Sequence, residues 1–406
     1  LAVACKDVDV RTLRAIIIGP HETPYEFGFF EVCSLVFSSP TVLALTTNCG
    51  RCRFNPNIYS NGKVCFTWRG ESGEQWSAAQ GMESILLSIQ SLMSTNPYEN
   101  EPGYEEAHAE TDKQNQAAYV KKIRHETLRI TVIQRLEEYL GLRSNGTIIS
   151  KPESKDVDGQ TLSAPFVPFK DLCKQRFLWY YSSYLAAVRD GMKDISVDEP
   201  FIRMPFEGSS NIMEGKFNYP ALEKRLHNIK AALDKELELW AHQGLEAVKG
   251  ETSVAANLSH KFQQVTHSLK ADDLPHDLRL DNGNPFVWIL TYFGKPMSNF
   301  DGGFFRIRIN FSVSFPDEQP RVRLETPIFH IRVAPDGTLC YFPNPMKKED
   351  LQSHIHSIIE ALEEENPAYD PRTLVNPEAF KLYWGPPADR KVYNRRLRRS
   401  VQDIME

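Results

Sequence analysis

The sequence predicts an α+β protein in which a helical region joins two similar modules. Each module runs through apolar strands, a Gly-x-x-Cys motif, an amphipathic helix and an Asn-Pro pair, and the two cysteines are Cys65 and Cys340. Each cysteine follows the glycine of an earlier turn, Gly28 or Gly303, by the same number of residues. Between the modules, apolar residues recur at helical spacing. One thiol-centred module therefore occurs twice.

The first module opens with strand patterns. Residues 14–18 and 29–37 are rich in branched and aromatic side chains, and turn residues bound them. A capping box at 77–80 precedes an amphipathic helix through 85–93. A further helical stretch covers residues 117–140 and ends at Gly141.

The middle of the chain is predicted to be helical. Residues 144–168 are polar and rich in Gly, Ser and Pro, which predicts a linker, and residues 250–257 are a second candidate. Apolar side chains then form two helical stripes, which are Phe177, Tyr181, Tyr184 and Val188, and Leu222, Leu226, Ile229, Leu233, Leu237 and Trp240. Burial in a core explains such stripes better than a docking surface does.

Strand patterns return in the final third. Residues 305–313 alternate apolar and polar side chains, which predicts a strand with one buried face. A helical pattern follows from Leu351 to Leu362.

Composition excludes several classes of protein. The chain has 406 residues, of which 41% are hydrophobic and 25% charged, as in ordinary globular proteins of two or three domains. A net charge of −6 gives no general attraction to nucleic acid or anionic membranes. Seven thinly spread cysteines indicate free thiols in a reducing compartment. We found neither a membrane-spanning run nor a signal peptide, and Leu1 is not an initiator methionine.

The segment from Asn57 to Cys65 carries the chemistry. A thiol can hold an acyl group as a reactive thioester, and a nearby carboxamide can donate to the oxyanion that forms when the thioester is attacked. Cys65 and Asn57 are therefore the candidate catalytic pair.

These motifs resemble the ubiquitin-conjugating enzyme family. Over about residues 5–240 the sequence is most similar to the Z-type branch, and the last third resembles a second, divergent core. The motifs that carry the likeness are Ile18-Gly19-Pro20, Thr23-Pro24-Tyr25-Glu26, Phe54-Asn55-Pro56-Asn57, Asn61-Gly62-Lys63-Val64-Cys65, Trp76-Ser77, Asn96-Pro97-Tyr98, Ile123-Arg124-His125-Glu126-Thr127, Phe315-Pro316, Gly337-Thr338-Leu339-Cys340 and Val375-Asn376-Pro377.

The resemblance implies two cores, each an antiparallel meander sheet with flanking helices. We expect the first, catalytic core at 1–142, a linker at 143–168, a helical extension at 169–250 and the second core at 258–406. It also implies that Cys65 accepts ubiquitin or a ubiquitin-like modifier from an activating enzyme and passes it to lysine. A ubiquitin ligase and protein substrates are further expected partners, and nucleic acid and membrane are not. The expected location is cytoplasmic, nuclear or both, with no cofactor and no metal.

The family's site residues map onto this sequence. Asn57 stands where the family has the asparagine that stabilises the oxyanion; the alternative is that its side chain braces the loop. Asn55 stands where most relatives have a histidine of mainly structural role. Tyr98, Glu99 and Asn100 lie in the loop that lines access for the lysine. Glu99 either orients the incoming amine or is an ordinary solvated charge.

The second core departs from this pattern. Cys340 keeps the thiol position and His330 the motif histidine, but Arg332 replaces the asparagine. Arg332 either stabilises an anion or faces solvent. The core either forms its own thioester or is a degenerate copy kept for binding or rigidity.

Several features leave alternatives open. Cys49 and Cys52 form a Cys-x-x-Cys pair, but no second pair follows, so loop thiols explain it better than a zinc site. Arginines near the C-terminus indicate a solvated helix face rather than a docking patch. The loop at 37–40 is shorter than in relatives, and the family's first helix has no counterpart before Leu1. The rival to an enzyme is a non-catalytic scaffold that binds ubiquitin or a conjugating partner.

Overall fold

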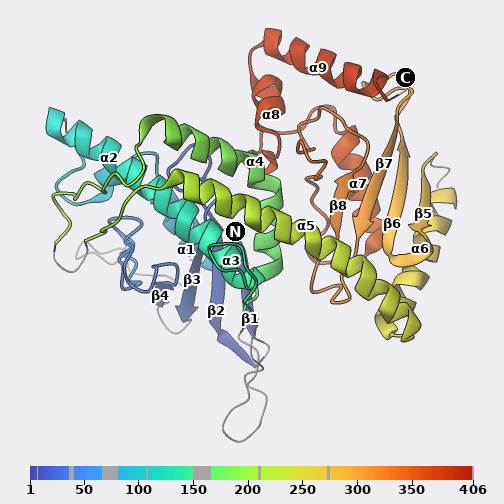
Figure 1. Ribbon diagram of the computed structural model, residues 1–406, viewed down its shortest axis with the longest axis horizontal. Coiled ribbons are helices and arrows are strands. Elements are labelled where there is room, and N and C mark those ends of the chain that lie inside the picture. Colours follow the sequence, from blue (N-terminus) through green and yellow to red (C-terminus); the bar gives the residue numbers. More distant parts are fainter. Residues whose placement is uncertain are drawn as a thin grey trace, which may run out of the picture. The chain divides into compact units, whose positions relative to one another are not determined.

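The computed structural model describes residues 1–6, 8–35, 41–65, 81–106, 108–149, 166–208, 212–271 and 275–404 (Figure 1). The chain divides into two compact units. The first comprises Leu1–Cys173 with Ala186–Ile229, and the second comprises Lys174–Leu185 with Lys230–Glu406. Each unit holds one four-stranded antiparallel sheet with helices around it, so the predicted α+β class with two cores is confirmed.

The sheet of the first unit is a meander in the order β1-β2-β3-β4. Every neighbouring pair is antiparallel, and Ile17 on β2 lies opposite Phe30 on β3. Both side chains are buried in the core of this unit. The strands are β1 (Ala2–Lys6), β2 (Asp9–Ile18), β3 (Phe29–Leu35) and β4 (Thr41–Ala44).

Helices follow this sheet in the order that the sequence predicts. Gly141 ends the last of them in the left-handed conformation with φ of 65°, which is typical of a glycine that closes a helix. The predicted capping box at 77–80 and the loop at 37–40 lie outside the described residues. The elements are α1 (Met82–Ser91), the 3-10 helix η2 (Pro97–Asn100), α2 (Glu110–Glu126), the π-helix η3 (Thr127–Gln134) and α3 (Arg135–Leu140).

The second unit repeats the meander in the order β5-β6-β7-β8. The alternation predicted from 305 to 313 is confirmed over β7, where Phe305, Ile307 and Ile309 are buried and the residues between them are more exposed. The strands are β5 (Asp277–Asp281), β6 (Asn284–Phe293), β7 (Phe304–Asn310) and β8 (Arg321–Leu324).

The helices of the second unit correct one prediction. α6 begins at Ser253, inside the candidate linker at 250–257, and the break before it is confined to a turn in which Glu251 has φ of 48°. The helical pattern after Cys340 is confirmed by α7. The elements are α6 (Ser253–Ala271), α7 (Leu351–Glu363), the 3-10 helix η4 (Pro371–Thr373), α8 (Pro377–Trp384) and α9 (Pro387–Gln402).

Two long helices, α4 (Lys170–Asp194) and α5 (Tyr219–Lys249), form the middle of the chain. Asn218 caps α5 by accepting a hydrogen bond from the N–H of Ala221 at 3.0 Å. The aromatic and apolar stripes are largely buried, with Phe177 and Leu226 fully so, which confirms that they belong to cores. Among the described residues, no helix is long and apolar enough to cross a bilayer.

Candidate active site

Both units place a cysteine in the same backbone frame. The N–H of Cys65 donates to the carbonyl of Asn57, and the N–H of Cys340 donates to the carbonyl of Arg332, each at 2.8 Å. The two hydrogen bonds close loops of equal length, so Arg332 occupies the position of Asn57. The structure therefore brings the predicted catalytic pair together and repeats its geometry in the second unit.

A glycine with positive φ shapes each loop. Gly62 has φ of 90° and Gly337 has φ of 87°, a conformation that residues with a Cβ rarely adopt. A Cβ on Gly62 would also lie 2.7 Å from the carbonyl oxygen of Ala44, and one on Gly337 would lie 2.2 Å from that of Leu324. The spacing of Gly-x-x-Cys thus follows from the turn that seats the loop against the last strand of each sheet.

The motif residue two positions before Asn57 or Arg332 braces the loop. The side-chain oxygen of Asn55 accepts from the N–H of Asn57 at 2.9 Å, and Nδ1 of His330 accepts from the N–H of Arg332 at 3.2 Å. The amide of Asn55 also donates to the Tyr25 hydroxyl at 3.0 Å and to a backbone carbonyl of the α1 end at 2.7 Å. Both side chains are buried, as expected of structural positions.

Cys65, which carries the candidate thiol, is partly exposed in the structure. The hydroxyl of Tyr59 forms a hydrogen bond with this thiol. Burial raises the pKa of Tyr59, and the neighbouring Cys65 adds to the rise, so the phenol stays protonated near neutral pH. Tyr59 was not among the sequence candidates; its place inside the loop that Asn57 and Cys65 close is the signal that could have identified it.

The ring of Tyr59 rests against a buried arginine. The guanidinium of Arg53 lies 4.7 Å from the ring centre and is held by the carbonyl of Pro56 and by Glu101 at 2.8 Å. A cation over an aromatic face is attracted by the ring quadrupole. The ring of Phe206, from the segment between α4 and α5, lies 5.9 Å from the same guanidinium. Arg53 therefore fixes Tyr59 beside the thiol.

The side chain of Asn57 is partly exposed. Its carbonyl oxygen is buried and has no hydrogen-bond partner among the described residues. This oxygen therefore does not brace the loop within the described residues. Asn55 braces it instead, through three hydrogen bonds.

The three residues of the predicted lysine access loop differ in their surroundings. Tyr98 is fully buried, with its ring centre 5.3 Å from Tyr104 and 5.2 Å from Phe206, so its side chain belongs to the core and lines no open surface. The amide of Asn100 donates to the carbonyl of Leu92 at 2.8 Å. Of the three residues, Glu99 alone is exposed.

Cys340 has the opposite environment from Cys65. Its side chain is fully buried, and burial raises the pKa of its thiol to about 11, although Arg176 and Arg332 oppose the rise. Near neutral pH the sulfur is therefore a protonated thiol. A buried neutral thiol is a poor nucleophile because only the thiolate attacks.

Cationic and aromatic side chains gather beside Cys340. The guanidiniums of Arg176, Arg332 and Arg372 lie 5.2, 5.8 and 5.5 Å from the ring centre of Phe342. Arg176 also stacks on Trp179 at 4.0 Å. Arg176 and Trp179 come from α4, which the local motif around Cys340 does not reveal.

The side chain of Arg332 pairs with Glu364 at 2.5 Å and is only 12% exposed. The solvent-facing alternative for Arg332 is therefore wrong.

His330 predicts a pH dependence of folding. Burial, reinforced by Arg332, lowers the pKa of His330 from 6.5 to about 3, so the folded state favours the neutral ring. The associated stability is complete above pH 6.5 and is lost as the pH falls toward 3, by up to about 1.4 kcal/mol per pH unit. His330→Asn, which copies Asn55, is expected to lose less stability between pH 7 and pH 5 in urea titrations. Replacing the exposed His260 should change nothing, and equal slopes for both variants and the parent chain would contradict this role.

The two thiols of the Cys-x-x-Cys pair lie in different surroundings. Cys49 is exposed and Cys52 is buried, and burial raises the pKa of Cys52. Among the described ranges, no three His, Cys, Asp or Glu side chains converge as metal ligands would. Nothing in the described part of the chain therefore adds a ligand to this pair.

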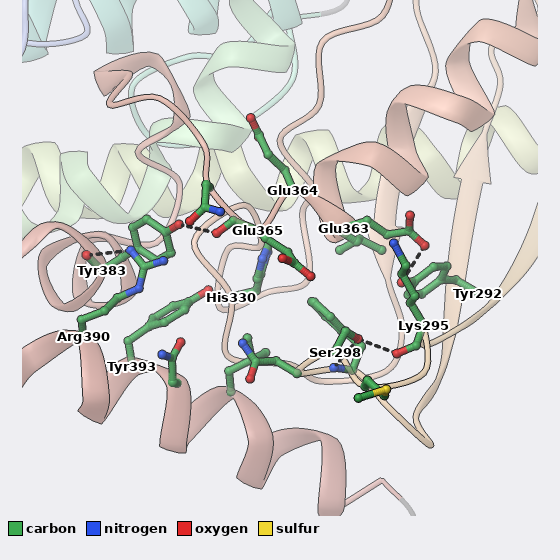
Figure 2. A pocket seen from close by; sticks show the side chains of 17 residues that line it. Tyr292, Lys295, Ser298, His330, Glu363, Glu364, Glu365, Tyr383, Arg390 and Tyr393 are labelled. Atoms are coloured by element: carbon green, nitrogen blue, oxygen red, sulfur yellow. Dashed lines mark hydrogen bonds between the residues drawn. The ribbon is translucent and has the colours of Figure 1, made fainter.

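A cavity of about 280 Å³ lies in the second unit (Figure 2). His330 lies at its wall, and the guanidinium of Arg390 stacks on Tyr383, with its centre 3.2 Å from the ring centre. The hydroxyl of Tyr292 donates to Glu363 at 3.2 Å. Cys340 does not line this cavity, so the cavity is not part of the thiol site. Both signs of charge line it, which selects no class of ligand.

Comparison with known proteins identifies the family. The model of the family described as ubiquitin-conjugating enzyme matches residues 2–127 and 260–400, which is more than half of the chain. Both matched segments contain one of the two thiol frames. The chain belongs to the ubiquitin-conjugating enzyme family.

Individual relatives extend this result. The chain is 36% identical over 240 residues to ubiquitin-conjugating enzyme E2 Z of Homo sapiens, a match that covers 56% of this chain and 60% of that protein. It is 35% identical over 147 residues to the human dual E2 ubiquitin-conjugating enzyme/E3 ubiquitin-protein ligase BIRC6, covering 33% of this chain and 3% of that protein. A solved E2 domain from Toxoplasma gondii matches 36% of this chain and 96% of its own at 14% identity and a TM-score of 0.30. The chain thus spans about 60% of the length of the E2 Z relatives.

Proposed function

We propose that this protein accepts ubiquitin or a ubiquitin-like modifier from an activating enzyme as a thioester on Cys65 and transfers it to a lysine amine. One observation carries the proposal: of two cysteines held in the same backbone frame, Cys65 is partly exposed and Cys340 is fully buried. Family membership supports the reaction class.

Transfer from a thioester needs little acid–base catalysis, because the thioester is already activated. The site has to admit a neutral lysine amine and stabilise the oxyanion of the tetrahedral intermediate. The amide of Asn57 is the proposed oxyanion donor, and Glu99 is the proposed carboxylate that orients the amine. No cofactor takes part in this scheme.

We assign a different role to the second core. The burial of Cys340 and the raised pKa of its thiol favour a core that contributes binding or rigidity rather than a second thioester, although Arg176 and Arg332 oppose the rise. A scaffold function for the whole chain is the competing hypothesis, and the exposure of Cys65 argues against it.

A charging assay tests the proposal. The full chain is incubated with activating enzymes, ATP and ubiquitin or a ubiquitin-like modifier, and the products are separated with and without reductant. A reductant-sensitive adduct whose thioester maps to Cys65 by mass spectrometry is expected. No adduct with any modifier and activating enzyme would favour the scaffold.

Asn57→Ala is expected to charge normally but to discharge to free lysine about a hundredfold more slowly, because a donor to the oxyanion is lost. Single-turnover discharge of the preformed thioester measures this effect. Asn61→Ala is the matched control, since Asn61 is in the same loop and, among the described residues, its side chain accepts only from the N–H of Lys63 at 3.0 Å. Equal slowing by both variants would assign Asn57 to loop bracing instead.

A further inference from the structure

The loop that holds Cys65 carries a phenol that the reaction scheme above does not use. The N–H of Tyr59 donates to the carbonyl of Lys63 at 2.9 Å, and the N–H of Gly62 donates to the carbonyl of Tyr59 at 3.0 Å. Ile58 and Val64 form an antiparallel bridge next to this turn. The loop therefore folds back on itself, and this turn brings Tyr59 close to Cys65.

The Tyr59 ring is held in place by Arg53. Arg53, which is 5% exposed, stacks on the ring and is anchored by Glu101 and by the carbonyl of Pro56. The ammonium of Lys63 lies 5.8 Å from the same ring centre. With its ring held in this way, the hydroxyl forms its hydrogen bond with the thiol of Cys65.

The second core offers an internal comparison. Its turn has the same hydrogen bonds, from the N–H of Ala334 to the carbonyl of Thr338 at 2.9 Å and from the N–H of Gly337 to the carbonyl of Ala334 at 2.8 Å. Alanine thus stands where Tyr59 stands, and the cysteine that follows is buried. At this position of the turn, tyrosine accompanies the partly exposed cysteine and alanine accompanies the buried one.

We propose that Tyr59 is a catalytic residue that donates a hydrogen bond to the sulfur of Cys65 when that sulfur leaves as a thiolate. The proposal rests on the function assigned to Cys65 above. The amine nitrogen bonds to the thioester carbonyl carbon, the carbon–sulfur bond breaks, and its electron pair goes to sulfur. The proton lost by the amine goes to water. Tyr59 keeps its own proton and only donates the hydrogen bond to the sulfur.

The same contact acts before charging. A hydrogen bond to a charged group is stronger than one to a neutral group, so the phenol favours the thiolate over the thiol. Removing such a donor is expected to cost on the order of tenfold in the affected step. Tyr59→Phe removes the hydroxyl and leaves the ring on which Arg53 stacks, so it isolates this effect from packing.

Two readouts test the inference in the full-length protein. The first is the rate of iodoacetamide alkylation of Cys65 against pH, followed on its own peptide by mass spectrometry; Tyr59→Phe is expected to move the profile to higher pH. The second is single-turnover discharge of the thioester to lysine, expected to slow by about tenfold. Tyr104→Phe, which removes a phenol elsewhere in the same unit, is the control and should match the parent chain in both.

The outcomes separate this inference from the proposed function. An unchanged alkylation profile in Tyr59→Phe would overturn the hydrogen bond to the thiolate, whatever the charging assay shows. A shifted profile with unchanged discharge would overturn the leaving-group role. Failure of the parent chain to charge at all would remove the proposed function and, with it, the leaving-group role, while the alkylation arm would still decide whether Tyr59 stabilises the thiolate.

Discussion

Cys65→Ala is expected to abolish the reductant-sensitive ubiquitin adduct, while Cys340→Ala is expected to leave it intact. The two residues share one backbone frame, with equal hydrogen bonds of 2.8 Å from each cysteine N–H. They differ in access, because Cys65 is partly exposed and Cys340 is fully buried, and burial raises the pKa of the Cys340 thiol to about 11. Adduct formation on denaturing gels with and without reductant measures the difference.

A third variant separates loss of the nucleophile from loss of folding. Cys65→Ser keeps a nucleophilic oxygen, and an adduct formed through it is an oxygen ester that resists thiol reductants but is cleaved by hydroxide. The appearance of this adduct would identify position 65 as the acceptor. A Cys65→Ala protein that still charges fully would move the activity to Cys340 and contradict the assignment.

Glu207→Gln is expected to destabilise the first unit by about 3–5 kcal/mol, because it leaves a buried ammonium without its counter-ion. Lys122 and Glu207 lie 2.6 Å apart, and their side chains are 1% and 2% exposed. Burial lowers the pKa of Lys122, and Glu207 opposes that change. Urea denaturation of the full chain measures the loss of stability.

Two comparisons sharpen this experiment. The double variant Lys122→Met, Glu207→Leu removes both charges and should recover much of the stability. Glu110→Gln breaks the exposed pair of Glu110 with Lys113 and should have little measurable effect. A Glu207→Gln protein as stable as the parent chain would show that Lys122 is neutral or finds another partner.

The Lys122–Glu207 pair also matters for the site, because it fixes the segment that carries Phe206. That ring packs against Tyr98 and Arg53, and Arg53 holds Tyr59 beside the thiol. Breaking the pair is therefore expected to loosen the packing of Phe206 and Arg53, and with it the placement of Tyr59 beside Cys65.

Short-range patterns predicted most of the fold. The alternation over β7 and the glycine at 141 each act within a few residues, so the sequence reveals them directly. The beginning of α6 was missed because Gly250 and the polar residues after it suggest a linker, whereas one left-handed residue, Glu251, suffices to separate two helices.

The site was predictable only where its chemistry is local. Gly62 and Cys65 follow from one turn, and the structure places them as the motif requires. Cys340 feels the charge of Arg176, which stacks on Trp179 in a helix far away in the sequence. The ring of Tyr98 likewise packs against Phe206, which is also distant in the sequence. Contacts of this kind follow from tertiary packing, which residue spacing does not encode.

The division of α4 and α5 between the two units has a practical consequence. Residues 174–185 and 230–249 belong with the second sheet, while the adjoining residues of the same two helices belong with the first. Neither unit is therefore a continuous stretch of chain. No single proteolytic cut or truncation separates the two units, because at least one of the resulting pieces would carry helical residues of the other unit. Testing one core alone therefore requires point variants in the intact polypeptide.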